Sequence, residues 1–207
     1  MNKQLSMPLS RPVVLAEVSN RPALGLPAAG IIVAGSAFAA LCAHISVPLF
    51  FTPVPLTVQP FAVLLLGLLL SPRMASATFV AYLLEGAAGL PVFAPGPAPF
   101  GLAHLFGPTG GYLLAYPLAA ALISYLWRRT GRSFVAAVLA AAAGDAVILA
   151  CGAAWLAVLT HASLMHVAAL AVLPFLPGEA LKVAAAAGFA RGATRLRRSK
   201  SAAGAGR

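Results

Sequence analysis

Charged side chains are scarce in this sequence, and acidic ones are almost missing. Charged residues make up 9% of the 207 positions and hydrophobic residues 61%, so the mean hydropathy is +0.93. A soluble domain carries about 25% charged residues. A chain with so few charges does not have enough polar surface to face water on all sides. The composition therefore excludes an ordinary soluble protein and predicts a protein that is dissolved in lipid.

Cysteine clusters and catalytic motifs are missing as well. Cys42 and Cys151 lie in separate apolar stretches without a C-x-x-C spacing, which does not support a disulfide framework or a zinc site. There is no H-E-x-x-H, no G-x-S-x-G and no phosphate-binding loop. We therefore expect no catalytic residue, no metal and no cofactor, and we do not expect an enzyme. The net charge of +10 does not indicate nucleic-acid binding, because the basic residues flank apolar runs instead of forming a patch with aromatic platforms.

Six apolar stretches approach the length of about 20 residues that a spanning helix needs. Backbone groups cannot stay unpaired in lipid, so each stretch is predicted to be helical. The expected fold is an all-α polytopic membrane protein, with a transmembrane domain over 27–190 between an N-terminal tail (1–26) and a basic C-terminal tail (191–207). The expected helices are Pro27–Val47, Leu56–Leu70, Met74–Gly89, Thr109–Trp127, Phe134–Leu159 and Ala168–Ala190.

The basic residues predict the orientation of these helices. All but one of the 14 Lys and Arg residues precede the first stretch, follow the sixth, or lie between the second and third or the fourth and fifth. With six spans, all these segments lie on one side. Cytoplasmic segments of membrane proteins are enriched in Lys and Arg. Both termini are therefore predicted to be cytoplasmic, in a multi-pass protein of the cell membrane whose basic tail attracts lipid headgroups.

Four charged side chains interrupt the apolar stretches: Glu85, Asp145, Glu179 and Lys182. At 1.5 Å per helical residue they lie about 14–20 Å from the cytoplasmic ends of their helices, near the middle of a hydrocarbon core about 30 Å thick. Ionisable groups at such depths usually mark a binding site or a pathway. Glu179 and Lys182 share one helix face, and either present two ligand-binding groups or form an ion pair that neutralises itself.

Other features indicate close packing and covering loops. The run Pro174–Gly178 breaks the sixth helix, which is tolerated at depth where backbone lines a cavity. The connections over 47–57 and 90–108 are rich in Pro or Gly and resemble functional lids. Small residues at Gly35, Ala39 and Ala43 permit the close approach of another helix, from this chain or from another subunit. The four histidines are scattered, and we interpret them as interface residues.

The sequence contains four distinctive segments, Thr52–Gln59, Gly89–Ala94, Gly107–Tyr112 and Leu173–Lys182. Together they resemble the BioY family of biotin-specific S components of energy-coupling factor (ECF) transporters. This resemblance implies a six-helix fold with a vitamin pocket near the outer face, joined to a transmembrane coupling protein and ATPase subunits. It also implies that the Ala39-x-x-x-Ala43 stripe docks on the coupling protein. Glu179 stands where the family usually has Asp.

The chemistry of biotin matches side chains in these stretches. Lys182 is expected to meet the ligand's carboxylate, while Glu179 or Asp145 accepts hydrogen bonds from its ureido N–H groups. Gln59 or Tyr112 is expected to reach the ureido carbonyl. Two other functions stay open, namely an S component for thiamine or riboflavin and an intramembrane enzyme that uses the acidic residues as acid and base. The remaining candidates for the binding site are the aromatic residues Phe93, Phe50, Tyr82 and Trp155, with Glu85 ranked below Glu179.

Overall fold

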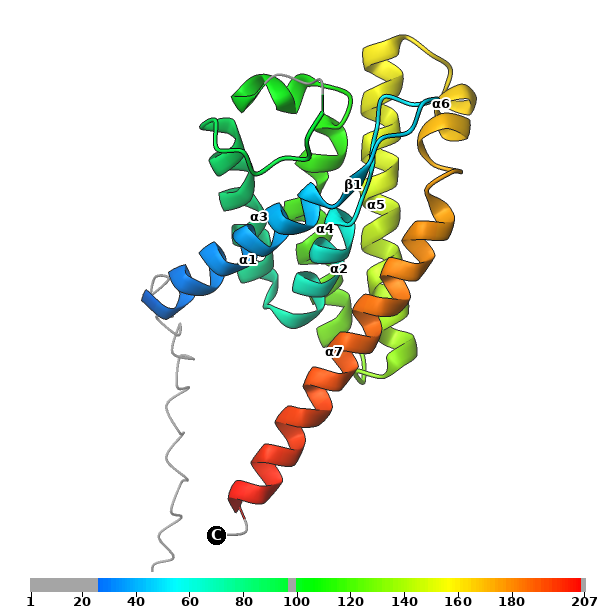
Figure 1. Ribbon diagram of the computed structural model, residues 1–207. Coiled ribbons are helices and arrows are strands. Elements are labelled where there is room, and N and C mark those ends of the chain that lie inside the picture. Colours follow the sequence, from blue (N-terminus) through cyan, green and yellow to red (C-terminus); the bar gives the residue numbers. More distant parts are fainter. Residues whose placement is uncertain (1–25, 97–99, 206–207) are drawn as a thin grey trace, which may run out of the picture.

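The computed structural model describes residues 26–96 and 100–205 of the chain (Figure 1). Most of these residues are helical, and the two strands form a minimal antiparallel ladder. The elements in chain order are α1 (Leu26–His44), β1 (Ser46–Val47), β2 (Leu56–Thr57), α2 (Gln59–Leu69), α3 (Pro72–Ala87), the 3-10 helix η1 (Gly101–Phe106), α4 (Gly110–Arg129), α5 (Phe134–Thr160), α6 (Leu164–Ala171) and α7 (Leu176–Ala205).

Several helices have the length and composition of membrane spans. Within the described ranges, α1, α4 and α5 are long and apolar enough to cross a membrane, and α6 with α7 makes a fourth candidate if this pair, bent by 58°, is one span. The shorter α2 is also apolar. The prediction of a helical membrane protein is confirmed at this level. Six spans and cytoplasmic termini stay predictions, and the N-terminal tail lies outside the described residues.

Local sequence signals explain where several helices begin. Ser71 and Ser133 precede α3 and α5, and each side chain accepts a hydrogen bond from the backbone N–H three residues later. Such caps satisfy one of the unpaired donors in a first helical turn. Ser163 does the same for α6. Proline stands in the first turn of α2 and α3, where its missing N–H costs nothing.

The first connection differs from the prediction. We expected helices up to Val47 and from Leu56, but α1 ends at His44 and α2 begins at Gln59. The residues between them form a hairpin in which Ser46 pairs with Thr57 and Val47 with Leu56. Prolines in this segment disfavour helix in the residues that precede them. Cross-strand pairing then satisfies backbone groups that a helix would otherwise have paired.

The sixth stretch is broken, as predicted, but the break comes earlier. The helix stops at Ala171 and restarts at Leu176, so Pro177 and Gly178 belong to the first turn of α7. Proline is tolerated in this turn because its N–H would have had no helical partner. The separate helix α6 (Leu164–Ala171) begins before Ala168, where the sixth helix was expected to start. Beyond Ala190, α7 continues through the basic segment to Ala205.

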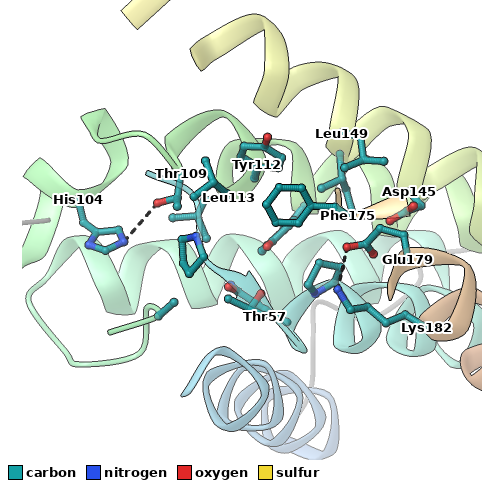
Figure 2. Close-up of a pocket in the computed structure, with 17 residues that line it drawn as sticks. Thr57, His104, Thr109, Tyr112, Leu113, Asp145, Leu149, Phe175, Glu179 and Lys182 are labelled. Atoms are coloured by element: carbon teal, nitrogen blue, oxygen red, sulfur yellow. Dashed lines mark hydrogen bonds and ion pairs between the residues drawn. The ribbon is translucent and has the colours of Figure 1, made fainter. Parts of the chain in front are cut away.

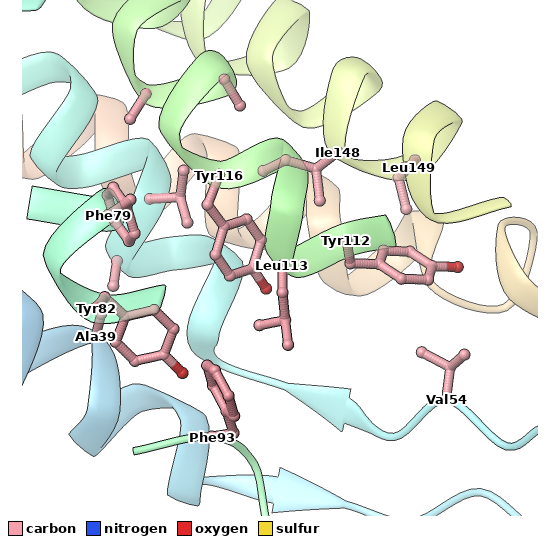
Figure 3. Packing of buried hydrophobic residues seen from close by; sticks show 14 of the residues in the cluster. Ala39, Val54, Phe79, Tyr82, Phe93, Tyr112, Leu113, Tyr116, Ile148 and Leu149 are labelled. Atoms are coloured by element: carbon pink, nitrogen blue, oxygen red, sulfur yellow. The ribbon is translucent and has the colours of Figure 1, made fainter. Parts of the chain in front are cut away.

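Helix α4 lies at the centre of the bundle and packs against α2, α3 and α5. One end of the core is built from aromatic rings in edge-to-face contact (Figure 3): the ring centroids of Phe79 and Tyr116 are 5.8 Å apart, and those of Tyr82 and Phe93 are 5.4 Å apart. Each such pair contributes about 0.5–1.5 kcal/mol beyond the area it buries. This rigid cluster fixes the side of the bundle on which the connection after α3 folds back.

Candidate binding pocket

A pocket lies between α2, α4, α5 and the start of α7, and the β1–β2 hairpin covers it (Figure 2). The cavity volume is about 40 Å³, which holds about three water molecules. A vitamin-sized ligand therefore requires the covering segments or the wall side chains to move apart. The lining consists of Val54, Pro55, Thr57, Gln59, Pro60, Ala94, His104, Thr109, Tyr112, Leu113, Tyr116, Asp145, Ile148, Leu149, Phe175, Glu179 and Lys182.

One end of the pocket holds two carboxylates and an ammonium group (Figure 2). Lys182 Nζ donates to Glu179 Oε1 at 2.7 Å, so the ion pair, one of the two alternatives that the sequence left open, is present. Asp145, from α5, interacts electrostatically with both residues. Asp145 and Glu179 are only 6% and 4% exposed. Their atoms Asp145 Oδ1 and Glu179 Oε2 are buried and have no hydrogen-bond partner within the described part of the chain.

The break before α7 places this cluster. Glu179 lies in the first turn of α7, where its backbone N–H donates to the carbonyl of Phe175 at 2.9 Å. The positive end of a helix dipole stabilises a carboxylate in this position. Lys182 follows one turn later on the same face. On the opposite wall, Gly144 packs against Ile123 of α4, so α5 comes close enough to bring the adjacent Asp145 to the pocket.

The other end of the pocket is polar but carries no carboxylate. His104, from η1, lies 3.4 Å from the hydroxyl of Thr109, measured at its Nε2 atom, and its ring stacks on Phe93 with centroids 4.9 Å apart. Thr109 directly precedes α4. Our interpretation of the histidines as interface residues is wrong for His104, which is 7% exposed and lines the pocket. The only feature of the sequence that indicated a pocket role for His104 was its position just before the Gly107–Tyr112 segment.

Five of the predicted binding residues line the pocket: Gln59, Tyr112, Asp145, Glu179 and Lys182. Tyr112 lies across Gly152 of α5, where a Cβ atom would collide with its ring, and its hydroxyl donates to the carbonyl of Ala171 at 2.9 Å. That hydrogen bond ties α4 to the end of α6.

Three other predicted aromatic residues, Tyr82, Trp155 and Phe93, do not line the pocket. They support it through contacts with the residues around it. Tyr82 accepts from Gln59 Nε2 and donates to the carbonyl of Val92, both at 2.8 Å. Trp155 donates to the carbonyl of Gly107 at 2.9 Å and packs against Gly111, where a Cβ atom would collide with it. These contacts fix the segments on either side of η1. Phe93 supports His104, whereas Phe50 is fully exposed at the hairpin tip.

Glu85, the binding candidate ranked below Glu179, does not line the pocket. Its carboxylate accepts a hydrogen bond from Ser36 Oγ at 2.8 Å, in a separate groove between α1 and α3. The prediction used only the distance along the helix. Helical rise gives the depth of a side chain in the bilayer, but it does not give the direction in which the side chain points.

The small-residue stripe of α1 faces the bundle and is not available to another subunit. Ala39 and Ala43 are 0% exposed, and a Cβ atom at Gly35 would come within 2.7 Å of Thr78 Cγ2 on α3. The opposite face carries the exposed side chains Val33 and Leu41. The stripe therefore packs α1 against this chain's own helices, and its predicted role in docking a partner is not supported by its position.

The pocket residues missed by sequence reasoning are mainly apolar. Ile148, Leu149 and Leu113 form the wall between the two polar ends, and Phe175 lies in the break before α7. Val54 and Pro55 reach the pocket from the hairpin. In a sequence this rich in apolar residues, Ile148, Leu149 and Leu113 do not stand out from residues that face lipid or the core. The Pro-rich hairpin segment was the one available signal, because its composition already indicated an ordered lid.

This chain is similar to known proteins in both sequence and fold. Residues 19–199 match the family model described as the BioY family. The chain is 40% identical to the probable biotin transporter BioY of Pyrococcus horikoshii, over 65% of this chain and 76% of that protein. It is 33% identical to the biotin transporter BioY2 of Lactococcus lactis, over 73% and 81% of the two chains. A crystal structure of the S-component for biotin from an ECF-type ABC transporter matches with a TM-score of 0.74 at 25% identity, covering 83% of this chain and 91% of the other.

Proposed function

The chain belongs to the BioY family, and from this premise we propose that it is the biotin-binding S component of an ECF-type importer. The observation that carries the proposal is the order of groups along the pocket: a charged cluster, an apolar wall and a second polar end (Figure 2). Biotin has a ureido ring, an apolar sulfur ring with an aliphatic chain, and a carboxylate, in the same order. Small-ligand pockets typically combine apolar walls with a few placed polar groups.

The charge of the cluster favours the ureido ring at that end. Lys182 is already neutralised by Glu179 at 2.7 Å, and Asp145 adds a second carboxyl group. A ligand carboxylate would meet more negative than positive charge there, contrary to the role predicted for Lys182 from the sequence. The two ureido N–H groups instead supply donors for Asp145 Oδ1 and Glu179 Oε2, which have no partner in the described residues. Lys182 then donates to the ureido carbonyl.

The ligand's carboxylate then lies near Thr109 and His104. Thr109 supplies a hydroxyl donor, and the start of α4 directly after it presents backbone N–H groups. The first turn of a helix favours an anion because its N–H groups have no helical partner and the dipole is positive there. The carboxylate of biotin therefore occupies the end of the pocket that is covered by η1 and the hairpin.

The proposed setting is the cell membrane, with six spans and both termini in the cytoplasm. Helices occupy all six predicted stretches, and the last is divided into α6 and α7. The short α2 and α3 span with cover from their neighbours, since both pack against α4. Basic residues at the α4–α5 turn and along the end of α7 lie where cytoplasmic segments carry Lys and Arg.

An importer of this kind needs partners that use ATP. The sequence has no phosphate-binding loop, so a transmembrane coupling protein and ATPase subunits supply the energy, as the S-component likeness suggests. The chain itself is then a binding subunit and not an enzyme. Its partner surface is a face other than the Gly35–Ala39–Ala43 stripe, which is buried against α2 and α3.

Calorimetric titration of the purified chain in detergent tests this function. We expect saturable binding of biotin at one site per chain, with no heat from thiamine or riboflavin at the same concentrations. Binding of either of these vitamins without binding of biotin would establish the alternative of an S component for another vitamin. Consumption of the added vitamin by the chain alone would instead point to an enzyme.

A further inference from the structure

A second hollow lies between α1 and α3, separate from the biotin pocket. Its volume is about 510 Å³, and it shares no lining residue with the pocket described above. Val33, Ala37 and Leu41 of α1 form one wall, and Pro91 and Val92 close one end. Because two of these α1 side chains, Val33 and Leu41, are more than half exposed, the groove opens sideways on the surface that faces lipid.

The floor of this groove carries a carboxylate without a cation. Glu85 Oε1 accepts from Ser36 Oγ at 2.8 Å, while Ser36 also contacts the carbonyl of Val33. The one ion pair within the described ranges is that of Lys182 and Glu179, so Glu85 has no ammonium or guanidinium group at ion-pair distance. A carboxylate on a lipid-facing surface is costly unless a cation or hydrogen-bond donors reach it.

The groove offers a second acceptor at His44. Its Nδ1 lies 2.8 Å from the carbonyl of Ala40. A carbonyl oxygen can only accept, so Nδ1 carries the proton. In the neutral ring Nε2 is then an acceptor. Glu85 and His44 both line the groove, so each presents an acceptor to N–H donors of a ligand there. A primary ammonium has three such donors, whereas a quaternary ammonium has none.

We propose that this groove binds one phospholipid with a primary ammonium headgroup, whose ammonium meets Glu85. The groove lies near the ends of α1 and α3, since Glu85 is two residues from the end of α3 and His44 is the last residue of α1. One helical turn is about 5 Å, so a headgroup reaches Glu85 from the bilayer surface. Charge complementarity to Glu85 favours this lipid over an anionic lipid without an ammonium group, and the N–H donors of its headgroup favour it over a choline lipid.

The test uses the full chain in nanodiscs made from equal parts of phosphatidylethanolamine, phosphatidylcholine and phosphatidylglycerol. After extraction into mild detergent, native mass spectrometry counts the lipids that stay bound. We expect one phosphatidylethanolamine per chain, enriched about tenfold over phosphatidylcholine, because a hydrogen bond to a charged group supports a difference of this size. Glu85→Gln should lose this enrichment. Arg73→Gln, on the same helix but outside the groove, should keep it.

A second variant tests the groove without touching the carboxylate. Leu41→Trp places a larger side chain in the wall and should also lose the bound lipid. Equal retention of the choline and ethanolamine lipids, or full retention in Glu85→Gln, would overturn the proposal. So would crosslinking of a basic partner side chain to position 85 in the assembled transporter. Biotin titration of the same samples separates this inference from the proposed function, because the groove and the biotin pocket share no residue.

Discussion

Asp145 and Glu179 in the charged cluster and Glu85 in the groove lie at similar sequence distances from the basic ends of their helices, yet we propose different ligands for the two sites. In the cluster, both carboxylates are buried and one ammonium stands beside them. In the groove, one carboxylate meets a serine and opens toward lipid. The comparison shows that distance along a helix does not define a site. The direction of the side chain and the charges of its neighbours define it.

The neighbours also decide what each site accepts. An ammonium already balances one carboxylate of the cluster, so a neutral ligand with N–H donors satisfies the remaining oxygen atoms without adding charge. The groove has no cation of its own among the described residues, so a positively charged ligand is favoured there. Substitutions that change charge without changing shape can therefore separate the two sites.

The largest effect is expected from Glu179→Gln. This change removes the ion-pair partner of Lys182 and one proposed acceptor for the ureido ring, and breaking a buried pair from one side costs about 3–5 kcal/mol. Biotin affinity should fall by about 100-fold or more, and the midpoint of thermal unfolding should fall as well. Calorimetry and a thermal-shift measurement check both. Glu85→Gln is the matched control, and equal affinity in the two variants would contradict the proposed role of the cluster.

A smaller loss is expected from Asp145→Asn. The amide keeps the size of the side chain but replaces one carboxylate acceptor for the ureido ring. Losing a hydrogen bond to a charged group costs about 1.5–3 kcal/mol, so the dissociation constant of biotin should rise about tenfold. Competition with a fluorescent biotin derivative measures this change. Unchanged affinity would assign the ureido ring to Glu179 and Lys182 alone.

The direction of the ligand is tested with biotin and its uncharged amide. Thr109→Val should weaken biotin about fivefold, the effect of one hydrogen bond of about 1 kcal/mol, and weaken the amide less. Lys182→Ala should weaken both ligands by the same factor, because Lys182 meets the ureido carbonyl in both. A loss in Lys182→Ala that is confined to biotin would place the carboxylate at Lys182, as the sequence alone predicted.

The smallest effect is expected from Glu85→Gln on biotin itself. Glu85 does not line the pocket, and its hydrogen bond to Ser36 joins α1 to α3. The dissociation constant of biotin should therefore stay within the error of the titration. A measurable loss would mean that the groove and the pocket are coupled, and that the separation of the two sites is incomplete.

The sequence predicts well those features that depend only on residue spacing within one segment of the chain. Apolar length locates the helices, the Pro-rich run locates the break before α7, and the spacing of Glu179 and Lys182 places both on one face of a helix. Each of these follows from helix geometry within a single segment. The pairing of Glu179 with Lys182 needed no knowledge of the other helices.

Features that depend on how helices face one another were not predictable. The stripe of Gly35, Ala39 and Ala43 fits contact with a partner as well as contact within the chain, and only packing against Thr78 decides between them. The direction of the Glu85 side chain likewise depends on how α3 packs against the other helices. The antiparallel pairing of β1 with β2 was also not predictable, because such apolar residues are equally typical of the ends of spanning helices.

The hairpin that covers the pocket has a consequence for the rates of binding. Its strands are held by two residue pairs and by the hydrogen bond from the Val58 N–H to the carbonyl of Ile45. We expect this hairpin to open before a ligand enters the pocket, so association should be slower than diffusion. The hairpin must open again before the ligand leaves, so it should lengthen the residence time as well.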